Sequence, residues 1–128
     1  YLENALVNHV LRNTAYTTPG TTVYVGLIKY YDAAVVEAGT LTQEASGGAY
    51  ARVQVTAWDA ASNGATQNTG AITFPTATAD WGGISGVIIS DHASAGNVLL
   101  HGSLTSARDV KDGDVFKFNA GDLDVTFA

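Results

Sequence analysis

The sequence contains no cysteine and no methionine, and the absence of cysteine excludes several kinds of chemistry. Without cysteine the chain can form no disulfide, no thiolate nucleophile and no cysteine-ligated zinc site. Because an initiator methionine is also missing, we expect that residues before Tyr1 have been removed or omitted. Charged residues make up only 14% of the chain, whereas glycine occurs 14 times. This composition favours short elements joined by many turns.

Long apolar runs and clusters of positive charge are absent as well. No stretch approaches the roughly 18 consecutive apolar residues of a membrane span, so we expect no membrane partner. The net charge is −6, and the six basic residues are scattered singly along the chain. A nucleic-acid-binding surface needs clustered cations to displace counterions from phosphates. We therefore expect no nucleic-acid partner either.

What is present is enough apolar material for one domain. With 46% hydrophobic residues in 128 positions, we predict a single domain over residues 1–128. In the first 13 residues, Leu2, Leu6 and Val10 recur at helical spacing, which predicts an N-terminal helix over 1–13. A helix of about 12 residues is barely stable alone. Its apolar face must therefore be buried within the domain or against a neighbouring chain.

From residue 21 onward the pattern changes to the alternation that is typical of strands. The expected strands cover residues 21–31, 50–57, 71–74, 86–90, 98–104, 115–118 and 123–127. The fold class that this predicts is mainly β, a β-sandwich or barrel of about seven short strands with one N-terminal α-helix. The segments 32–49 and 59–70 within the β-domain (21–128) are predicted to be long loops, and as such they are candidates for contacts with another chain.

The residues that could carry chemistry form no recognisable catalytic pattern. His101 has no partner visible in the sequence, so it is a weak general base and is expected to face solvent or a partner. Asp109, Asp112 and Asp114 could offer oxygens to calcium, but their spacing is not that of an EF-hand. Asp112-Gly113 suits a tight turn between strands equally well, and we prefer that interpretation. We predict no enzyme activity, no cofactor and no metal.

The order of several motifs along the chain carries more information than any one of them. They are "GGAYAR" at Gly47–Arg52, "FPTATADWG" at Phe74–Gly82 and the closing "AGDLDVT" at 120–126. Together with the N-terminal helix, this series resembles a family of small tailed-bacteriophage virion proteins that are commonly labelled tail-fibre or virion structural proteins. The resemblance covers nearly the whole chain and departs from the family pattern mainly in the Tyr30–Leu41 region.

Within the second motif we expect Trp81 to be a core anchor. Burying an indole removes roughly 200 Å² from water, which corresponds to about 4–5 kcal/mol before entropy costs. Gly82 and Gly83 would let the chain turn tightly beside that ring and begin the next strand. A contact between subunits is the alternative role for this segment.

The resemblance implies a non-enzymatic structural protein of a bacteriophage virion, assembled in the host cytoplasm. We predict a capsid decoration (cement) protein that binds the major capsid protein or neighbouring virion proteins, as a homo-oligomer such as a trimer. A tail or tail-fibre component of the same virion is the alternative. A carbohydrate-binding module that uses Tyr30, Tyr31, Tyr50 or Trp58 as stacking platforms is the second alternative.

Candidate functional residues are therefore sought at interfaces. The helix face of Leu2, Leu6 and Val10 is the first candidate. Aromatic residues and arginine are over-represented in binding hot spots, which adds the two tyrosines at the end of the first expected strand and three residues of the loop around Glu44–Arg52. These are Tyr30, Tyr31, Glu44, Tyr50 and Arg52.

Overall fold

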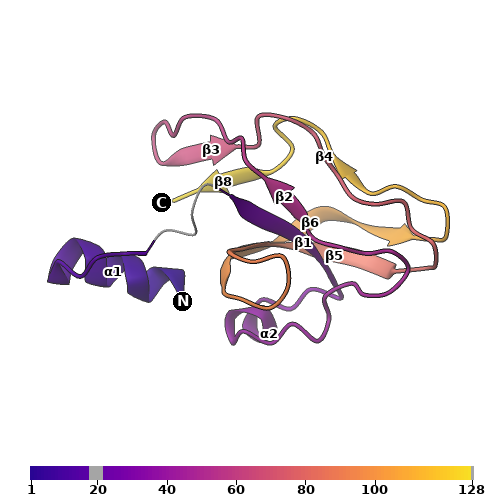
Figure 1. Cartoon of the computed structure of the whole chain (residues 1–128), viewed down its shortest axis with the longest axis horizontal. Helices are drawn as coiled ribbons and strands as arrows, with labels where there is room; N and C mark the ends of the chain where they lie inside the picture. Colours follow the sequence, from indigo (N-terminus) through magenta and orange to yellow (C-terminus); the bar gives the residue numbers. More distant parts are fainter. Residues whose placement is uncertain (18–21, 128) are drawn as a thin grey trace.

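The structure is a computed structural model that describes residues 1–17 and 22–127. Its elements follow the chain as α1 (Leu2–Arg12), β1 (Val23–Lys29), α2 (Ala33–Glu37), β2 (Val53–Val55), β3 (Ala65–Gln67), β4 (Ile72–Thr73), β5 (Gly82–Ser90), β6 (Val98–Val110), β7 (Lys117–Phe118) and β8 (Asp124–Thr126), as Figure 1 shows. The prediction of a mainly β fold with an N-terminal helix is confirmed. Within the described residues, neither helix is long and apolar enough to cross a bilayer.

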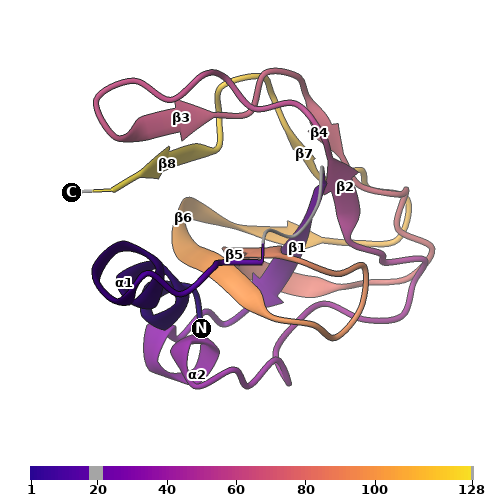
Figure 2. The ribbon, with the colours of Figure 1, turned by 60° about the vertical axis from the view of Figure 1, so that its left-hand side comes forward.

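The strands form one four-stranded sheet and two two-stranded ribbons. The sheet has the order β2-β1-β5-β6, and the ribbons pair β3 with β8 and β4 with β7; all neighbours are antiparallel. Figure 2 shows the ribbons on one side of the sheet and α2 on the other. β5 begins at Gly82 and β6 ends at Val110, so both strands are longer than the predicted 86–90 and 98–104.

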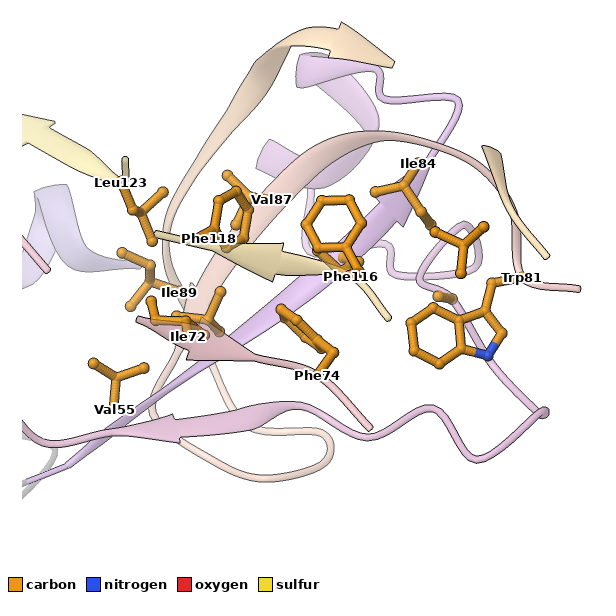
Figure 3. Close-up of a cluster of buried hydrophobic side chains, with 14 of the residues drawn as sticks. Val55, Ile72, Phe74, Trp81, Ile84, Val87, Ile89, Phe116, Phe118 and Leu123 are labelled. Carbon is orange, nitrogen blue, oxygen red and sulfur yellow. The ribbon is translucent and has the colours of Figure 1, made fainter. Parts of the chain in front are cut away.

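The main core lies between the sheet and the ribbons, and aromatic rings dominate it (Figure 3). Phe74, Phe116 and Phe118 form a cluster of edge-to-face pairs with ring centroids 5.2–6.4 Å apart. Such pairs add about 0.5–1.5 kcal/mol each beyond the burial of their area. Phe116 and Phe118 are both buried, and Lys117 between them is exposed, as the alternation of a strand requires.

A smaller core lies on the opposite face of the sheet, where α2 packs. Val36 of α2 contacts Ile28 and Ile88 there and is only 2% exposed. The prediction of a continuous loop over 32–49 is therefore wrong at Ala33–Glu37. The helix forms because the Asp32 carboxylate accepts hydrogen bonds from the amides of Ala34 (2.9 Å) and Val35 (3.4 Å), which caps its N-terminus.

The second predicted loop, 59–70, contains a β-hairpin. Asn63 and Gly64 both have positive φ angles, 52° and 75°, as a two-residue type I′ turn requires. Ser62 and Ala65 exchange two backbone hydrogen bonds of 3.0 Å across this turn. The chain then enters β3, which pairs with β8. The loop prediction is wrong here because the polar composition of the segment concealed an Asn-Gly hairpin signal.

Asn68, directly after β3, is a fully buried polar residue whose side chain joins two segments. Its amide donates hydrogen bonds to the carbonyls of Gly70 (2.7 Å) and Asn119 (3.0 Å), and its oxygen accepts one from the Leu123 amide (2.9 Å). All three partners are backbone groups next to a strand: Gly70 precedes β4, Asn119 follows β7 and Leu123 precedes β8. The Asn68 side chain therefore satisfies backbone donors and acceptors that strand pairing does not satisfy.

We expect Asn68→Ala to lower the free energy of unfolding by about 2–3 kcal/mol, because it leaves buried backbone groups without partners. Urea unfolding monitored by tryptophan fluorescence measures this loss. Asn119→Ala, which removes an exposed side chain and keeps the Asn119 carbonyl, is the control. Equal stability of Asn68→Ala and the natural chain would contradict the assignment.

Candidate functional site: the predicted interface residues

Three of the predicted interface residues, Glu44, Tyr50 and Arg52, form one hydrogen-bonded network. The Arg52 guanidinium donates to both carboxylate oxygens of Glu44 at 2.8 Å, and the Tyr50 hydroxyl donates to Oε2 at 2.8 Å. The Arg52 side chain is 3% exposed and that of Glu44 is 15% exposed. This is a bidentate, largely desolvated ion pair, the strongest geometry for an arginine and a carboxylate.

Tyr50 reaches this network from the edge of the sheet. β2 pairs with β1 only as far as Val25, and the Ile28–Glu44 bridge lies beyond it. Between them, the Leu27 amide donates to the Tyr50 hydroxyl at 2.9 Å. Burial of the phenol, and secondly the nearby carboxylate of Glu44, raise the pKa of Tyr50 well above its usual value. The neutral Tyr50 phenol therefore accepts the hydrogen bond of the Leu27 amide, which a neighbouring strand would accept in a continuous sheet.

The raised pKa of Tyr50 makes stability depend on alkaline pH. In the unfolded chain the phenol ionises near pH 10, while in the folded chain it keeps its proton. The unfolded state then releases a proton first, so stability falls as the pH rises above about 10, by roughly 1.4 kcal/mol per pH unit. Urea unfolding at several alkaline pH values gives the slope of the unfolding free energy against pH. This slope should be smaller in Tyr50→Phe, by the contribution of one proton. Identical slopes in the two proteins would contradict the assignment.

Arg52 also holds the loop between β5 and β6. Its Nη1 donates to Ser90 Oγ and to the carbonyls of His92 and Ala95, each at 2.9 Å. The hydrogen bond to Glu44 raises the pKa of Arg52 above its usual value, so the guanidinium is charged under all ordinary conditions. The polar groups of this residue are thus engaged inside the chain. That Glu44, Tyr50 and Arg52 also contact a partner stays a prediction.

Trp81 lies in the main core with 2% of its surface exposed. Its indole N–H donates to the Gly48 carbonyl at 2.9 Å, and its ring meets Tyr50 edge-on with centroids 5.4 Å apart. Gly48 has a φ of 53°, and a Cβ there would lie 2.9 Å from the indole nitrogen. Gly48 is therefore required both for its turn and for the close approach of Trp81.

Tyr30 and Tyr31 differ sharply in their surroundings. Tyr30 is 70% exposed, with a φ of 49°. Tyr31 is half-buried, and its hydroxyl lies 2.8 Å from Nδ1 of His101. Nε2 of His101 in turn lies 2.6 Å from the Glu37 carboxylate. The prediction that His101 faces solvent or a partner is therefore wrong, since it joins α2 to the sheet within one chain.

This arrangement of acid, imidazole and phenol does not favour catalysis. Burial, and secondly the charge of Glu37, raise the pKa of the Tyr31 phenol, so the group stays protonated at neutral pH and is a poor nucleophile. Among the described residues, no group of three or more histidine, cysteine or acidic side chains is placed to hold a metal. The chain of hydrogen bonds is best explained as a clamp on α2.

The helix face of Leu2, Leu6 and Val10 is divided between the domain and its surroundings. Leu2 is 9% exposed and Leu6 is half-buried, whereas Val10 is 74% exposed. The first turn and a half of α1 therefore docks on the domain, and Val10 does not. Burial of Val10 against a neighbouring chain stays a prediction.

The chain was also compared with known families and proteins. A family model described as "Podophage GP4 fiber I protein gp80" matches residues 1–126. The chain belongs to this family. It is accordingly a structural component of a phage virion, as the resemblance predicted. A search of the curated proteins finds no match.

Within this family member, the first two of the three motifs meet in space. The carbonyl of Gly48 in the first motif accepts hydrogen bonds from the indole of Trp81 and from the Thr78 amide (3.0 Å) in the second. Asp80 accepts from the Asp112 amide at 2.9 Å, which ties the second motif to the β6–β7 turn. Asp112-Gly113 indeed forms a turn there, with Gly113 at φ 91°. The motifs therefore build the core and its closing turns.

Proposed function

We propose that this protein is a non-catalytic structural subunit of a virion fibre. The observation that supports this most is the family match, which spans residues 1–126 and carries the word fibre in its description. The polar groups that could carry chemistry are consistent with it. The Arg52 network and the His101 clamp are both occupied by partners within the chain, and such saturated networks rigidify a fold rather than bind substrate.

In this proposal the partners are neighbouring virion proteins and further copies of the chain, joined in the host cytoplasm as the particle assembles. Each contact can be modest, because a subunit held at several points dissociates only when all of them release together. The buried aromatic core and the internal hydrogen-bond network of Arg52 suit the task, because they favour one fixed conformation of the domain. The acidic charge of −6 gives no support to a nucleic-acid partner.

Capsid decoration is the second candidate, and the shape of the domain favours it. The described strands, including the longer β5 and β6, pack around a single aromatic core, and the described residues form no elongated shaft (Figure 1). Such a domain could lie on the outside of a capsid and reinforce the joints between major capsid subunits. The fibre is preferred because the family description names it.

The copy number of the protein in purified particles tests the two candidates. A fibre subunit should be present in a small multiple of the rotational symmetry of the tail, whereas a decoration protein should match the number of capsid positions that it covers. Quantitative mass spectrometry against the major capsid protein measures this ratio. Gold-labelled antibodies that mark only the capsid surface would overturn the fibre proposal.

A carbohydrate-binding function draws less support from the structure. Of the four proposed stacking residues, Tyr50 and Tyr31 are engaged in internal hydrogen bonds and Trp58 is half-buried, which leaves Tyr30 exposed. One exposed ring offers a sugar little contact surface, whereas ligand sites are concave and bury most of the ligand. A glycan array with the purified chain tests this, and specific binding that is lost in Tyr30→Ala would favour it.

A further inference from the structure

β6 and β8 each have one edge without a partner strand, and both strands border the same groove. Among the described strands, β6 is the last strand of its sheet, next to β5, and β8 pairs with β3 alone. A groove of about 410 Å³ lies between β6 and β8, and residues of both strands line it. Figure 2 shows β8 above β6 across this opening. Backbone groups that no strand pairs with therefore border the groove on two sides.

The separation of the two strands suits one additional strand. Among the described residues, no Cα atom of β6 lies within 8 Å of a Cα atom of β8. The two strands therefore do not pair directly, since opposite Cα atoms of paired strands are about 4.5–5.5 Å apart. A strand between them would lie about 4.7–4.9 Å from each, which requires a separation of roughly 9–10 Å. A groove that both strands line is consistent with this width.

The free backbone groups of β8 point away from β3. The Leu123 carbonyl and the Phe127 amide form hydrogen bonds of 3.3 Å and 2.8 Å with residues that flank β3. Alternate residues of an antiparallel strand direct their N–H and C=O groups to opposite sides, so the backbone groups of Asp124 and Thr126 face the other way. Both residues line the groove. β8 therefore offers donors and acceptors to a strand that lies there.

Gly102 of β6 leaves an open position in the groove. It is paired with the buried Val87, so a side chain at Gly102 would lie on the same face of the sheet as Val87. A Cβ built at Gly102 has no atom within 4 Å, and its φ is not in the left-handed region. Neither its backbone conformation nor close packing within the chain explains this glycine. A glycine inside a strand is typical of a place that a ligand or another backbone approaches closely.

The groove combines an apolar interior with an acidic rim. Ile89, Leu100 and Val125 line it and also belong to the main core or pack against it. Asp122 and Asp124 are exposed at its rim, and none of the described residues that line it is a lysine or an arginine. A second copy of the chain, with its own net charge of −6, is repelled from this rim. A basic segment is attracted to it.

We infer that this groove binds an extended segment of a different protein, in which aliphatic residues alternate with lysine or arginine. The segment adds a strand between β6 and β8, and its backbone forms hydrogen bonds with both. Its aliphatic side chains pack over Gly102, against Val87 and Val125, while a basic side chain on its opposite face lies beside Asp124. The inference rests on the proposed function only for the source of the segment, which is a neighbouring virion protein.

An NMR titration of the isotope-labelled, purified chain tests the groove. The probe is a capped synthetic peptide of about seven residues, the length of an ordinary strand, in which valine alternates with lysine. We expect its binding to shift the amide signals of residues 100–105 and 122–126, which contain the groove residues of β6 and β8. A peptide with glutamate in place of lysine should bind about tenfold more weakly or worse, because Asp122 and Asp124 repel it.

A second peptide control tests the backbone pairing. The lysine peptide with N-methyl groups on its lysine residues keeps the charge but loses the N–H donors along one edge. It should bind about tenfold more weakly than the unmethylated peptide, because an added strand is held mainly by its main-chain hydrogen bonds.

Gly102→Val should weaken binding of the lysine peptide about tenfold or more, because the new side chain fills the open position. Its melting temperature should equal or exceed that of the natural chain, since valine suits a strand better than glycine does. Gly83→Val is the matched control. Gly83 lies in β5, also has no atom within 4 Å of a built Cβ, and is not part of the groove, so this variant should bind the peptide as the natural chain does.

Several results would overturn the inference. They are the absence of shifts in the two segments, equal affinity for the lysine and glutamate peptides, full binding of the methylated peptide, and a Gly102→Val protein that binds like the Gly83→Val control. All of these measurements use the isolated chain and do not depend on the copy number or location of the protein in the particle. Failure of this inference is therefore distinguishable from failure of the fibre proposal.

Discussion

Replacing Trp81 by alanine should lower the free energy of unfolding by about 3–5 kcal/mol, the usual cost of truncating a buried aromatic residue. The ring is 2% exposed and contacts the largest core cluster. The substitution also leaves the Gly48 carbonyl without the indole donor at 2.9 Å. Since domains of this size are stable by only about 5–15 kcal/mol, we expect poor expression or a protein that is largely unfolded at 37 °C.

Trp81→Phe separates the two contributions. It keeps most of the apolar volume but removes the N–H donor, so we expect a loss of about 1–2 kcal/mol. Urea unfolding measures both variants, with Trp58 as the remaining tryptophan probe. If Trp81→Ala instead melted like the natural chain but failed to enter particles, Trp81 would be an interface residue and not a core anchor.

Local periodicity predicted the elements whose apolar side chains repeat regularly. The spacing of Leu2, Leu6 and Val10 placed α1 correctly, and the alternation around Val53 and Val55 placed β2. The two strands of the tail, expected at 115–118 and 123–127, were predicted for the same reason. Each of these signals is contained within one element and is independent of its partners.

Short elements escaped prediction because periodicity needs length. α2 has five residues, fewer than two turns, and its formation depends on the Asp32 cap more than on an apolar stripe. The hairpin at Asn63-Gly64 did carry a local signal, since both positions favour positive φ. The low apolar content of its flanks outweighed that signal.

The candidate site could not be assembled from the sequence because its contacts join distant segments. Arg52 reaches Ala95, 43 residues away, and Trp81 reaches Gly48, 33 residues away. The residue types predicted contacts with another chain. Only the three-dimensional arrangement shows that the polar groups of Glu44, Tyr50 and Arg52 bond to one another within the chain.

α1 and the rest of the domain are held in place by different kinds of interaction. The domain satisfies its buried polar groups internally, through Asn68, Tyr50 and Arg52. In contrast, no hydrogen bond or ion pair in the described residues joins α1 to the domain. Apolar contacts alone hold the helix, and they lack directional specificity. Such an element can be shared with a neighbouring subunit without breaking any polar network.

Replacing Arg52 by methionine should lower the free energy of unfolding by about 3 kcal/mol. The change preserves apolar volume but leaves the Glu44 carboxylate, 15% exposed, without its bidentate partner. Breaking a buried ion pair on one side costs about 3–5 kcal/mol, and the lower value applies here because Glu44 keeps some contact with water. The β5–β6 loop should also loosen, since the carbonyls of His92 and Ala95 lose a donor.

Amide hydrogen exchange and urea unfolding measure the two effects together. The amide exchange rates of residues 91–97 should be higher in Arg52→Met, through local opening of the loop and not through global unfolding. Arg108→Met, an exposed arginine on β6, is the matched control and should change stability by less than about 0.5 kcal/mol. The double variant Arg52→Met/Glu44→Gln should recover part of the loss, because it removes the unpaired charge. An Arg52→Met protein as stable as the Arg108→Met control would show that the network contributes nothing to folding, and Arg52 would then have to be explained by its contacts in the virion.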